Sequence, residues 1–303
     1  MFERIAIIGM GLIGSSIAHG IRRSKLTSFI AGHTQSESST KVAQSLGLAD
    51  EMYPTPEHAV QDADLIILCT PVGTYESLTS QIVNSIKPGA ILTDVGSVKK
   101  YVIDAVLPHL TQDIHFIPAH PIAGTEESGP ASGFAELFDN RWCILTPPPN
   151  SNPKYINKLK SFWEAMGAKV EFMEAEHHDT VLAVTSHVPH LIAYTMVGTA
   201  DHLRRISNFE VVQFSAAGFR DFTRIAASDP TMWRDVFLTN KESTLDILGR
   251  FTEELLALQR LIRTNDGEKL FEYFTETRNI RRGIVEAGQD TAIPNFGRDN
   301  SKK

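Results

Sequence analysis

Two polar side chains in the first half of the chain have the chemistry of a general base and its partner. His120 follows the apolar segment His115–Ile117, and Ser97 follows the apolar segment Ala90–Thr93. Functional groups of parallel sheets gather at the carboxyl ends of the strands, so we expect the two side chains to lie close together. A hydroxyl that orients an imidazole suits proton abstraction, and we predict that His120 and Ser97 are catalytic. A structural core histidine is the alternative, but it fits less well with a proline-flanked loop.

A carboxylate-binding group is expected in the second half of the chain. Arg220 and Arg224 lie four residues apart in a helix-like segment. Aromatic residues alternate with them, which indicates charges that are partly buried and held in position. Arginine binds a carboxylate through paired hydrogen bonds. A solvated charged face, on which Asp221 pairs with an arginine, is the simpler alternative; we favour a substrate carboxylate as the ligand of one arginine.

Histidines in the second half raise the question of a metal site. His187 and His190 are three residues apart and share a helix face, and His177 and His178 lie about three turns earlier. A helical zinc site typically uses histidines four residues apart with a nearby acid, so this spacing does not favour a metal. We expect no metal, a structural hydrogen bond for His187, and a substrate or cofactor contact for His190.

A glycine turn near the N-terminus is the element expected to bring a cofactor to these groups. The pattern G-x-G-x-x-G spans Gly9–Gly14, between the apolar run Ile5–Ile8 and the helix-like segment Ser15–Arg23. In that context glycines permit a tight turn, close approach of a pyrophosphate and close helix–strand packing. The helix N-terminus adds free N–H groups for phosphates. A glycine turn that binds nothing is the alternative; we predict a dinucleotide site at Gly9, Gly11, Leu12, Ile13 and Gly14.

The residues expected around the rest of the cofactor leave its identity open. NAD-selective enzymes usually carry an acidic residue about twenty positions after the fingerprint. Here Thr34 stands at that place, and the first carboxylate after the fingerprint is Glu37. Thr34 and Ser36 could instead hydrogen-bond a 2′-phosphate, so both NAD and NADP fit. Further cofactor contacts are expected after the next strand-like run, at Thr70, Pro71 and Val72. A plain strand-ending turn explains that stretch equally well.

The first half alternates strand-like and helix-like segments, which indicates an α/β Rossmann domain with a doubly wound, mostly parallel sheet. The strand candidates are Arg4–Ile8, Phe29–Gly32, Leu65–Thr70, Ala90–Thr93, His115–Ile117, Trp142–Thr146 and Lys169–Met173. The helix candidates are Gly11–Arg23, Ser38–Leu46, Tyr75–Ile86, Tyr101–Leu107 and Asn152–Met166.

From about residue 175 the pattern is all helical. One long helix is expected over Glu176–Leu203, kinked at Pro189. Further helices are expected at Glu210–Phe214, Arg220–Ala227, Pro230–Asn240, Ser243–Thr264 and Gly267–Gly288. We therefore predict a nucleotide-binding domain over residues 1–174, a helical substrate and dimerisation domain over 175–290, and a loose tail over 291–303. The apolar stripe of the segment 243–264 would be exposed alone, so we expect a homodimer.

Composition argues against several other classes of protein. The chain has 303 residues, is 42% hydrophobic, and carries a net charge of −7, which disfavours nucleic acid or an anionic membrane as a partner. We find no apolar run of the ~20 residues that a membrane span needs, and the N-terminus opens on a strand rather than a signal peptide. Cys69 and Cys143 lie in apolar runs and are expected to be reduced, which favours a cytoplasmic location.

Taken together, these motifs resemble the prephenate dehydrogenase family, and most closely its prephenate/arogenate (cyclohexadienyl) members in bacterial tyrosine biosynthesis. The order of the motifs matches from about residue 3 to residue 290. The matching stretches are Gly9–Gly14, Asp94–Lys99, His120–Glu126, Ser186–His190, Gly218–Arg224 and Met232–Asp235. Another Rossmann-plus-helical hydroxy-acid dehydrogenase and a noncatalytic dinucleotide sensor are the rival interpretations.

The resemblance implies oxidative decarboxylation of prephenate, arogenate or both, with hydride transfer to NAD or NADP. It implies that His120 accepts the proton of the ring hydroxyl and that Ser97 orients His120 and contacts the same hydroxyl. It also implies that Arg224 binds a substrate carboxylate. The remaining substrate-binding residues that it implies are Asp221, which would hold Arg224, together with His190, Thr125, Glu126 and Trp233.

Overall fold

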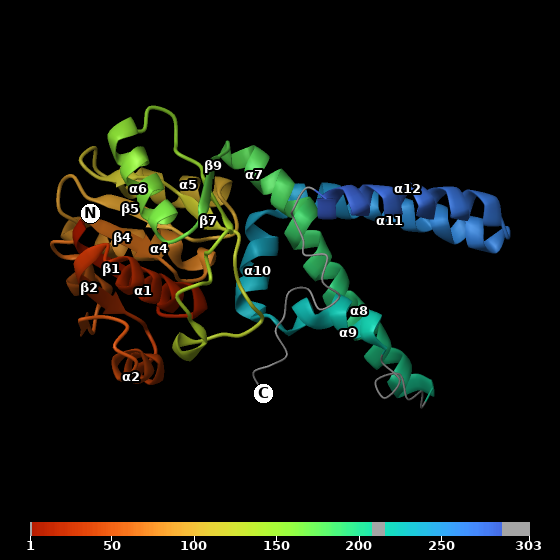
Figure 1. The fold of residues 1–303 in the computed structure, drawn as a ribbon, viewed down its shortest axis with the longest axis horizontal. Coiled ribbons are helices and arrows are strands. Elements are labelled where there is room, and N and C mark those ends of the chain that lie inside the picture. The colour runs from red at the N-terminus through yellow and green to blue at the C-terminus, as the bar shows by residue number, and fades with distance from the viewer. Residues whose placement is uncertain (1, 208–215, 287–303) are drawn as a thin grey trace. The chain divides into compact units, whose positions relative to one another are not determined.

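The computed structural model describes residues 2–207 and 216–286, and Figure 1 shows the course of the chain. Two compact units are present, residues 1–245 and 246–303. The predicted segment 210–214 and the predicted tail 291–303 lie outside the described residues.

A six-stranded parallel sheet forms the centre of the first unit, which confirms the predicted Rossmann fold. The strands pair in the order β3-β2-β1-β4-β5-β6, all parallel. Successive strands are added on one side of β1 up to β3 and on its other side from β4 onward, so the strand order reverses between β1 and β4. Their bounds are β1 (Phe2–Ile8), β2 (Thr27–His33), β3 (Glu51–Met52), β4 (Leu65–Leu68), β5 (Ile91–Asp94) and β6 (His115–Phe116). The two-residue strand β3 was too short for the sequence pattern to detect.

Helices cover both faces of this sheet because its strands are apolar on both sides (Figure 1). Ile5 and Ile7 of β1 join one buried cluster with α1 and α6, whereas Ala6 and Ile8 join a second cluster with α3, α4 and α5. The helices are α1 (Leu12–Ser24), α2 (Glu37–Ser45), α3 (Pro56–Val60), α4 (Tyr75–Ile82), α5 (Lys100–Val106) and α6 (Pro153–Ala165). The short helix α3 was not predicted.

A second sheet of three strands carries His120. Strand β7 (Ala119–Pro121) pairs antiparallel with β8 (Trp142–Leu145), which pairs parallel with β9 (Lys169–Phe172). The sequence predicts β8 and β9 in the main sheet and His120 in a loop, and both predictions are wrong. Pro118 lacks the N–H that would continue the ladder after β6, and the chain pairs instead with β8, with His120 opposite Ile144.

The helical part begins at α7 (Ala175–Leu182) and continues through a π-helical turn, Ala183–His187, into α8 (Val188–Ser207). The predicted single helix with a kink is therefore interrupted before Pro189. Proline has no N–H to donate to the carbonyl four residues earlier, and the wider turn accommodates that lost bond. The next elements are α9 (Ala217–Thr223), a 3₁₀ turn (Arg224–Ala227), α10 (Pro230–Thr239) and α11 (Lys241–Arg263).

One helical stretch, Ala175–Leu203, is long and apolar enough by length and composition to cross a membrane, so the expectation that no such segment exists is wrong. Interspersed polar residues hid it from a search for an uninterrupted apolar run. Core helices pass the same test, and this stretch places His178 and Asp179 in the buried interior of the first unit.

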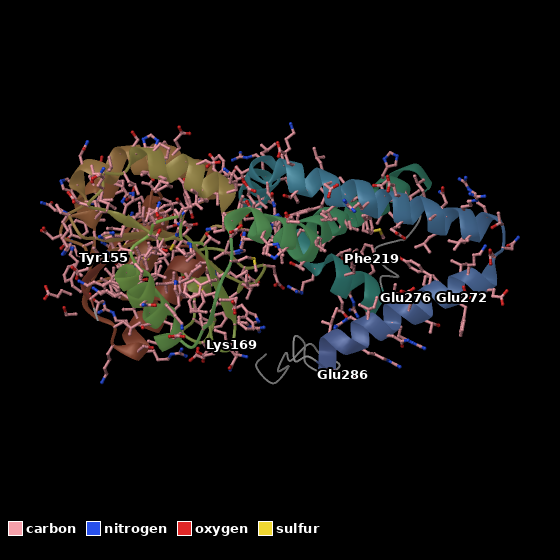
Figure 2. The ribbon with its side chains drawn as sticks, turned by 90° about the horizontal axis from the view of Figure 1, so that it is seen from above. Tyr155, Lys169, Phe219, Glu272, Glu276 and Glu286 are labelled. Atoms are coloured by element: carbon pink, nitrogen blue, oxygen red, sulfur yellow. The ribbon has the colours of Figure 1, made fainter. Side chains whose placement is uncertain are left out.

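The boundary between the two units falls within α11, so the second unit contains α11 from residue 246 onward together with the whole of α12 (Gly267–Glu286). Figure 2 shows the two helices diverging from the turn that joins them, with Glu272, Glu276 and Glu286 along α12. Both helices expose large apolar side chains, among them Leu255, Leu256, Ile262, Phe271, Phe274 and Ile280.

Candidate active site

The glycine turn has the geometry of a dinucleotide site. Gly9 has φ +102°, and a Cβ there would lie 2.7 Å from the carbonyl oxygen of Cys69; a Cβ on Gly14 would lie 2.0 Å from the carbonyl oxygen of Gly9. Only glycine therefore fits the turn and the close helix–strand contact. Above Gly11, the residue that caps α1, no atom lies within 4 Å of the Cβ position. The site is thus closed where the protein packs and open where a pyrophosphate would approach the helix N-terminus.

The residues after β2 offer hydroxyl groups and no acidic side chain near the end of the strand. Thr34 is half-buried, and Ser36 caps α2 by accepting a hydrogen bond from the N–H of Ser39 at 3.3 Å. The first carboxylate, Glu37, is exposed and pairs with Lys41. Leu12 and Ile13, in the first turn of α1, are partly buried beside the core.

Loops at the carboxyl ends of β4 and β5 pack on each other. Thr70 and Thr74 hydroxyls lie 2.8 Å apart, and Val72 is buried. A Cβ on Gly96 would lie 2.5 Å from Cγ1 of Val72. The predicted cofactor turn and the stretch that contains Ser97 therefore share one surface.

His120 is buried, with 7% of its surface exposed, and its immediate partner is another histidine. Nδ1 of His120 lies 2.8 Å from Nε2 of His178, and Nδ1 of His178 lies 2.8 Å from Oδ1 of Asp179. The sequence-based expectation names Ser97 as the orienting partner, but the hydrogen bond found at Nδ1 of His120 joins it to His178. Ser97 is half-buried in the neighbouring loop, and its catalytic role stays a prediction.

A buried ion pair supports the backbone beside His120. Nζ of Lys99 lies 2.5 Å from Oδ2 of Asp94 and donates to the carbonyl of Ala119 at 2.8 Å. Asp94 in turn accepts from the N–H groups of Gly96 and Ala119. Neither side chain of the pair is exposed. These bonds join the end of β5 to Ala119, the first residue of β7, and so fix the backbone position of His120 beside it.

Burial sets the charge state of the two histidines. Desolvation lowers the pKa of His120 well below its ordinary value, and the nearby His178 and the positive charge of Lys99 lower it further. Burial also lowers the pKa of His178, although the carboxylate of Asp179 opposes that shift. His120 is thus held neutral around pH 7, the form that a general base requires.

Arg224 reaches back to the Rossmann part of the unit. Its Nη1 donates to Oε2 of Glu126 at 2.8 Å, while its buried Nε has no hydrogen-bond partner among the described residues. The sequence-based interpretation has Asp221 hold Arg224, and this is wrong: Asp221 is exposed, and Glu126 makes the ion pair. Residues three apart are neighbours in both α- and 3₁₀-helices, so the spacing alone would allow this contact. Arg224, at the junction of α9 and the 3₁₀ turn, pairs instead with Glu126, which is distant in the chain.

His190 and Trp233 form a stacked pair. The two rings lie 3.7 Å apart, and Nδ1 of His190 lies 2.8 Å from the carbonyl oxygen of Ser186. Trp233 is buried with Val98 and Val236, so it packs the loop after β5 against α10. Thr125 is exposed, and its hydroxyl accepts from the N–H of Glu127.

His187 makes the structural hydrogen bond predicted for it. Its Nδ1 lies 3.1 Å from Nδ2 of Asn240, which also donates to the carbonyl of Asp179 at 2.8 Å.

Over residues 2–207 and 216–286, no group of three or more side chains that could hold a metal ion is present. Cys69 and Cys143, the two cysteines, are free thiols.

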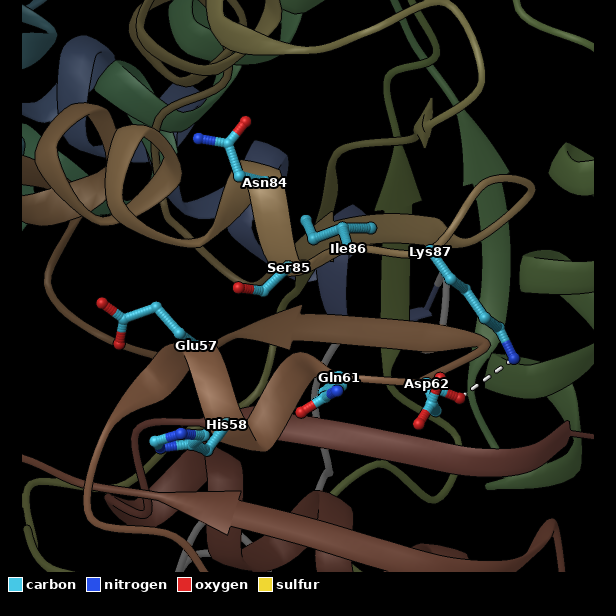
Figure 3. Close-up of a pocket in the computed structure, with 8 residues that line it drawn as sticks. All are labelled: Glu57, His58, Gln61, Asp62, Asn84, Ser85, Ile86 and Lys87. Carbon is cyan, nitrogen blue, oxygen red and sulfur yellow. Dashed lines mark hydrogen bonds between the residues drawn. The ribbon is translucent and has the colours of Figure 1, made fainter.

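One pocket, of about 480 Å³, lies away from this site (Figure 3). Asp62 and Lys87 line it, and they precede β4 and β5, whereas the site residues follow those strands. The carbonyl of Asp62 accepts from Nζ of Lys87 at 2.9 Å.

Sequence reasoning missed His178 and Asp179 as members of the site. A usable signal was present: a histidine beside an acid, a few residues after a strand candidate and in the first turns of a helix. Asp94 and Lys99 were part of a recognised motif, but no role was predicted for them.

Comparisons with known proteins agree with this architecture. Residues 17–172 match the family model described as prephenate dehydrogenase, nucleotide-binding domain, and residues 174–276 match the one described as prephenate dehydrogenase, dimerization domain. The chain is 39% identical to cyclohexadienyl dehydrogenase of Zymomonas mobilis, over 94% of this chain and 97% of the relative. It is 34% identical to prephenate dehydrogenase of Bacillus subtilis, over 98% and 80%.

A solved structure supports the same assignment. Prephenate dehydrogenase of Aquifex aeolicus in complex with hydroxyphenyl propionate and NAD+ is similar with a TM-score of 0.87 and 34% identity, covering 94% of this chain and 99% of that one. Because both family models match in order and the similarity runs over nearly the whole of these relatives, the chain belongs to the prephenate dehydrogenase family.

Proposed function

We propose that this protein catalyses the oxidative decarboxylation of prephenate, arogenate or both, with an NAD(P) cofactor, in tyrosine biosynthesis. The observation that carries the proposal is a buried, neutral His120 tied through Ala119 to Asp94 at the end of β5, in the same unit as a glycine turn after β1 that is shaped for a dinucleotide. Membership of the family supports the reaction class.

In this proposal, His120 takes the proton of the substrate hydroxyl while Ser97 contacts the same oxygen. A bound nicotinamide would accept the hydride that leaves the carbon bearing that hydroxyl. The ring carboxylate then leaves as CO₂, its bonding electrons complete the aromatic ring, and the ring oxygen takes a proton back to form the phenol. The chain's residues therefore manage one proton and hold the substrate, and no metal is needed for either task.

The test is to supply prephenate and arogenate with NAD and with NADP and to follow the absorbance of the reduced cofactor. Turnover of either substrate is expected. Cofactor binding without turnover would instead support a sensor, and turnover of simple hydroxy acids alone would support a different dehydrogenase.

Arg224 is proposed to bind a substrate carboxylate in exchange for part of its contact with Glu126. Replacing Arg224 with Ala is expected to raise KM by at least about 10-fold and to change kcat less, because the lost contact is made before the chemical step. Arg220→Ala, an exposed arginine on the same segment, is the matched control. An unchanged KM in steady-state kinetics would remove Arg224 from this role.

The hydroxyl groups of Thr34 and Ser36 support use of NADP alongside NAD. Replacing Thr34 with Asp is expected to shift the ratio of kcat/KM toward NAD by about 10-fold, since a carboxylate there would bind the ribose hydroxyls and repel a 2′-phosphate. Ser38→Asp, on the exposed first turn of α2, controls for added charge. A ratio unaltered by Thr34→Asp contradicts the proposed contact.

We also propose that the region from residue 175 acts as a substrate and dimerisation domain. The exposed apolar side chains of α11 and α12 support a second copy as their partner, as does the description of the matching family model. A cytoplasmic location is proposed from the free cysteines and the biosynthetic relatives. The absence of nucleic-acid and membrane partners stays a prediction.

A further inference from the structure

A row of three buried side chains leads away from the reacting nitrogen of His120. His120, His178 and Asp179 are 7%, 0% and 3% exposed, and each is joined to the next at 2.8 Å. They come from β7 and from α7, 58 residues apart in the chain. Such a row constrains the proton positions along it, because each contact needs one donor and one acceptor.

Asp179 determines which atom is the donor in each hydrogen bond of the row. Its Oδ1 accepts from the backbone N–H of Lys99 at 2.7 Å, and its Oδ2 accepts from the N–H of Lys100 at 2.9 Å. These are free N–H groups at the start of α5, so both oxygens of the Asp179 carboxylate already accept hydrogen bonds. An ionised carboxylate only accepts, so the proton of the neutral His178 ring must be on Nδ1.

The tautomer of His120 follows from that of His178. With its proton on Nδ1, His178 has only a lone pair at Nε2, so Nδ1 of His120 must carry the proton and donate it. The lone pair of His120 is then on Nε2, the nitrogen that faces away from the row. This is the tautomer that can accept a proton from a substrate.

We propose that His178 and Asp179 are positioning residues that fix His120 in its basic tautomer and share the charge that it gains. When Nε2 of His120 takes the substrate proton, the proton on Nδ1 can move to Nε2 of His178. The positive charge then lies beside the carboxylate of Asp179, with one proton gained and none lost from the row. This inference rests on the proposed role of His120 as the base.

A purely structural role is the competing explanation, since Asp179 also caps α5. Variants at His178 separate the two because they leave that cap in place. Glutamine can donate to Asp179 and accept from Nδ1 of His120, so it keeps the tautomer but cannot take up a proton. Leucine can do neither.

His178→Leu is expected to lower kcat by on the order of 10²-fold or more, and His178→Gln by roughly 10-fold, with KM and cofactor affinity unchanged in both. His177→Gln, the exposed neighbouring histidine, should match the parent protein. In a His120→Asn background, His178→Leu should cost nothing further, because a positioning residue acts only through its partner. An additive loss would point to a structural role instead.

Nitrogen NMR of the imidazole rings gives a readout that does not depend on turnover. The parent protein should show His120 protonated at Nδ1 and bare at Nε2, the same pattern in His178→Gln, and a mixture of tautomers in His178→Leu. A parent ring protonated at Nε2 overturns the inference, and so does a His178→Leu variant with parental kcat. If His178→Leu does not fold, the kcat of His178→Gln and the His120 tautomer in the parent spectrum still test the inference. Failure of the proposed function looks different: it appears as absent turnover in the parent, or full activity in His120→Asn.

Discussion

Replacing His120 with Asn should lower kcat by roughly 10²–10⁴-fold while the protein stays folded and binds its cofactor. Asparagine is similar in size and can keep a hydrogen bond to His178, but it cannot accept a proton near neutral pH. The loss is therefore expected in the chemical step, and KM should change little. Stopped-flow measurement of cofactor reduction under single-turnover conditions isolates that step.

The pH profile of the parent enzyme gives a second view of the same residue. Because burial and the charge of Lys99 lower the pKa of His120, the base is unprotonated through neutral pH. As pH falls through that lowered pKa, the ring gains a proton and kcat should decline. The decline is expected below the ordinary imidazole value of about 6.5, and His120→Asn should lack it. Retention of the full rate in this variant would leave the proposed mechanism without its base.

Replacing Lys99 with Met should destabilise the fold by about 3–5 kcal/mol, because the change leaves Asp94 as a buried charge without its counter-charge. Neither side chain of the pair is exposed, and Lys99 also holds the carbonyl of Ala119. Methionine matches the length of the lysine stem, so lost packing contributes little. The free energy of unfolding in urea is the measurement.

Two companion variants sharpen this prediction. Lys100→Met removes a neighbouring lysine that is paired at the surface with Asp104, and little change in stability is expected. Adding Asp94→Asn to Lys99→Met removes the uncompensated charge and should restore part of the loss, a coupling that independent sites would not show. Equal stability of Lys99→Met and the parent would mean that the pair contributes nothing to the fold.

Local chemistry explains which features could be predicted from the sequence. The glycine turn was predictable because its three glycines, the apolar run before them and the helix after them are contiguous, and steric contacts at Gly9 and Gly14 admit no other residue. His120 could be singled out as a candidate because it follows a strand candidate at the edge where ligands bind, although the structure places it in β7 rather than in a loop and its catalytic role stays a prediction. Both depend on neighbours in the chain.

Features that depend on distant neighbours were not predictable in the same way. The partner of His120 comes from a helix 58 residues later, and no periodicity links the two positions. Asp221 was a plausible partner for Arg224 because the two are three residues apart, whereas the ion-pair partner in the fold is Glu126, 98 residues away. The separate sheet of β7, β8 and β9 was missed because strand patterns do not report which strands pair.

The position of Asp179 limits how this enzyme could be recombined with its relatives. A chimera joined near residue 174 would take α5 and His120 from one parent, and the carboxylate that caps α5 and orients the row from the other. Small differences in the angle at which α7 leaves β9 would then misplace a proton-bearing nitrogen, even if both halves folded. A junction after Asn240, which also holds the Asp179 carbonyl, would keep the row within one parent.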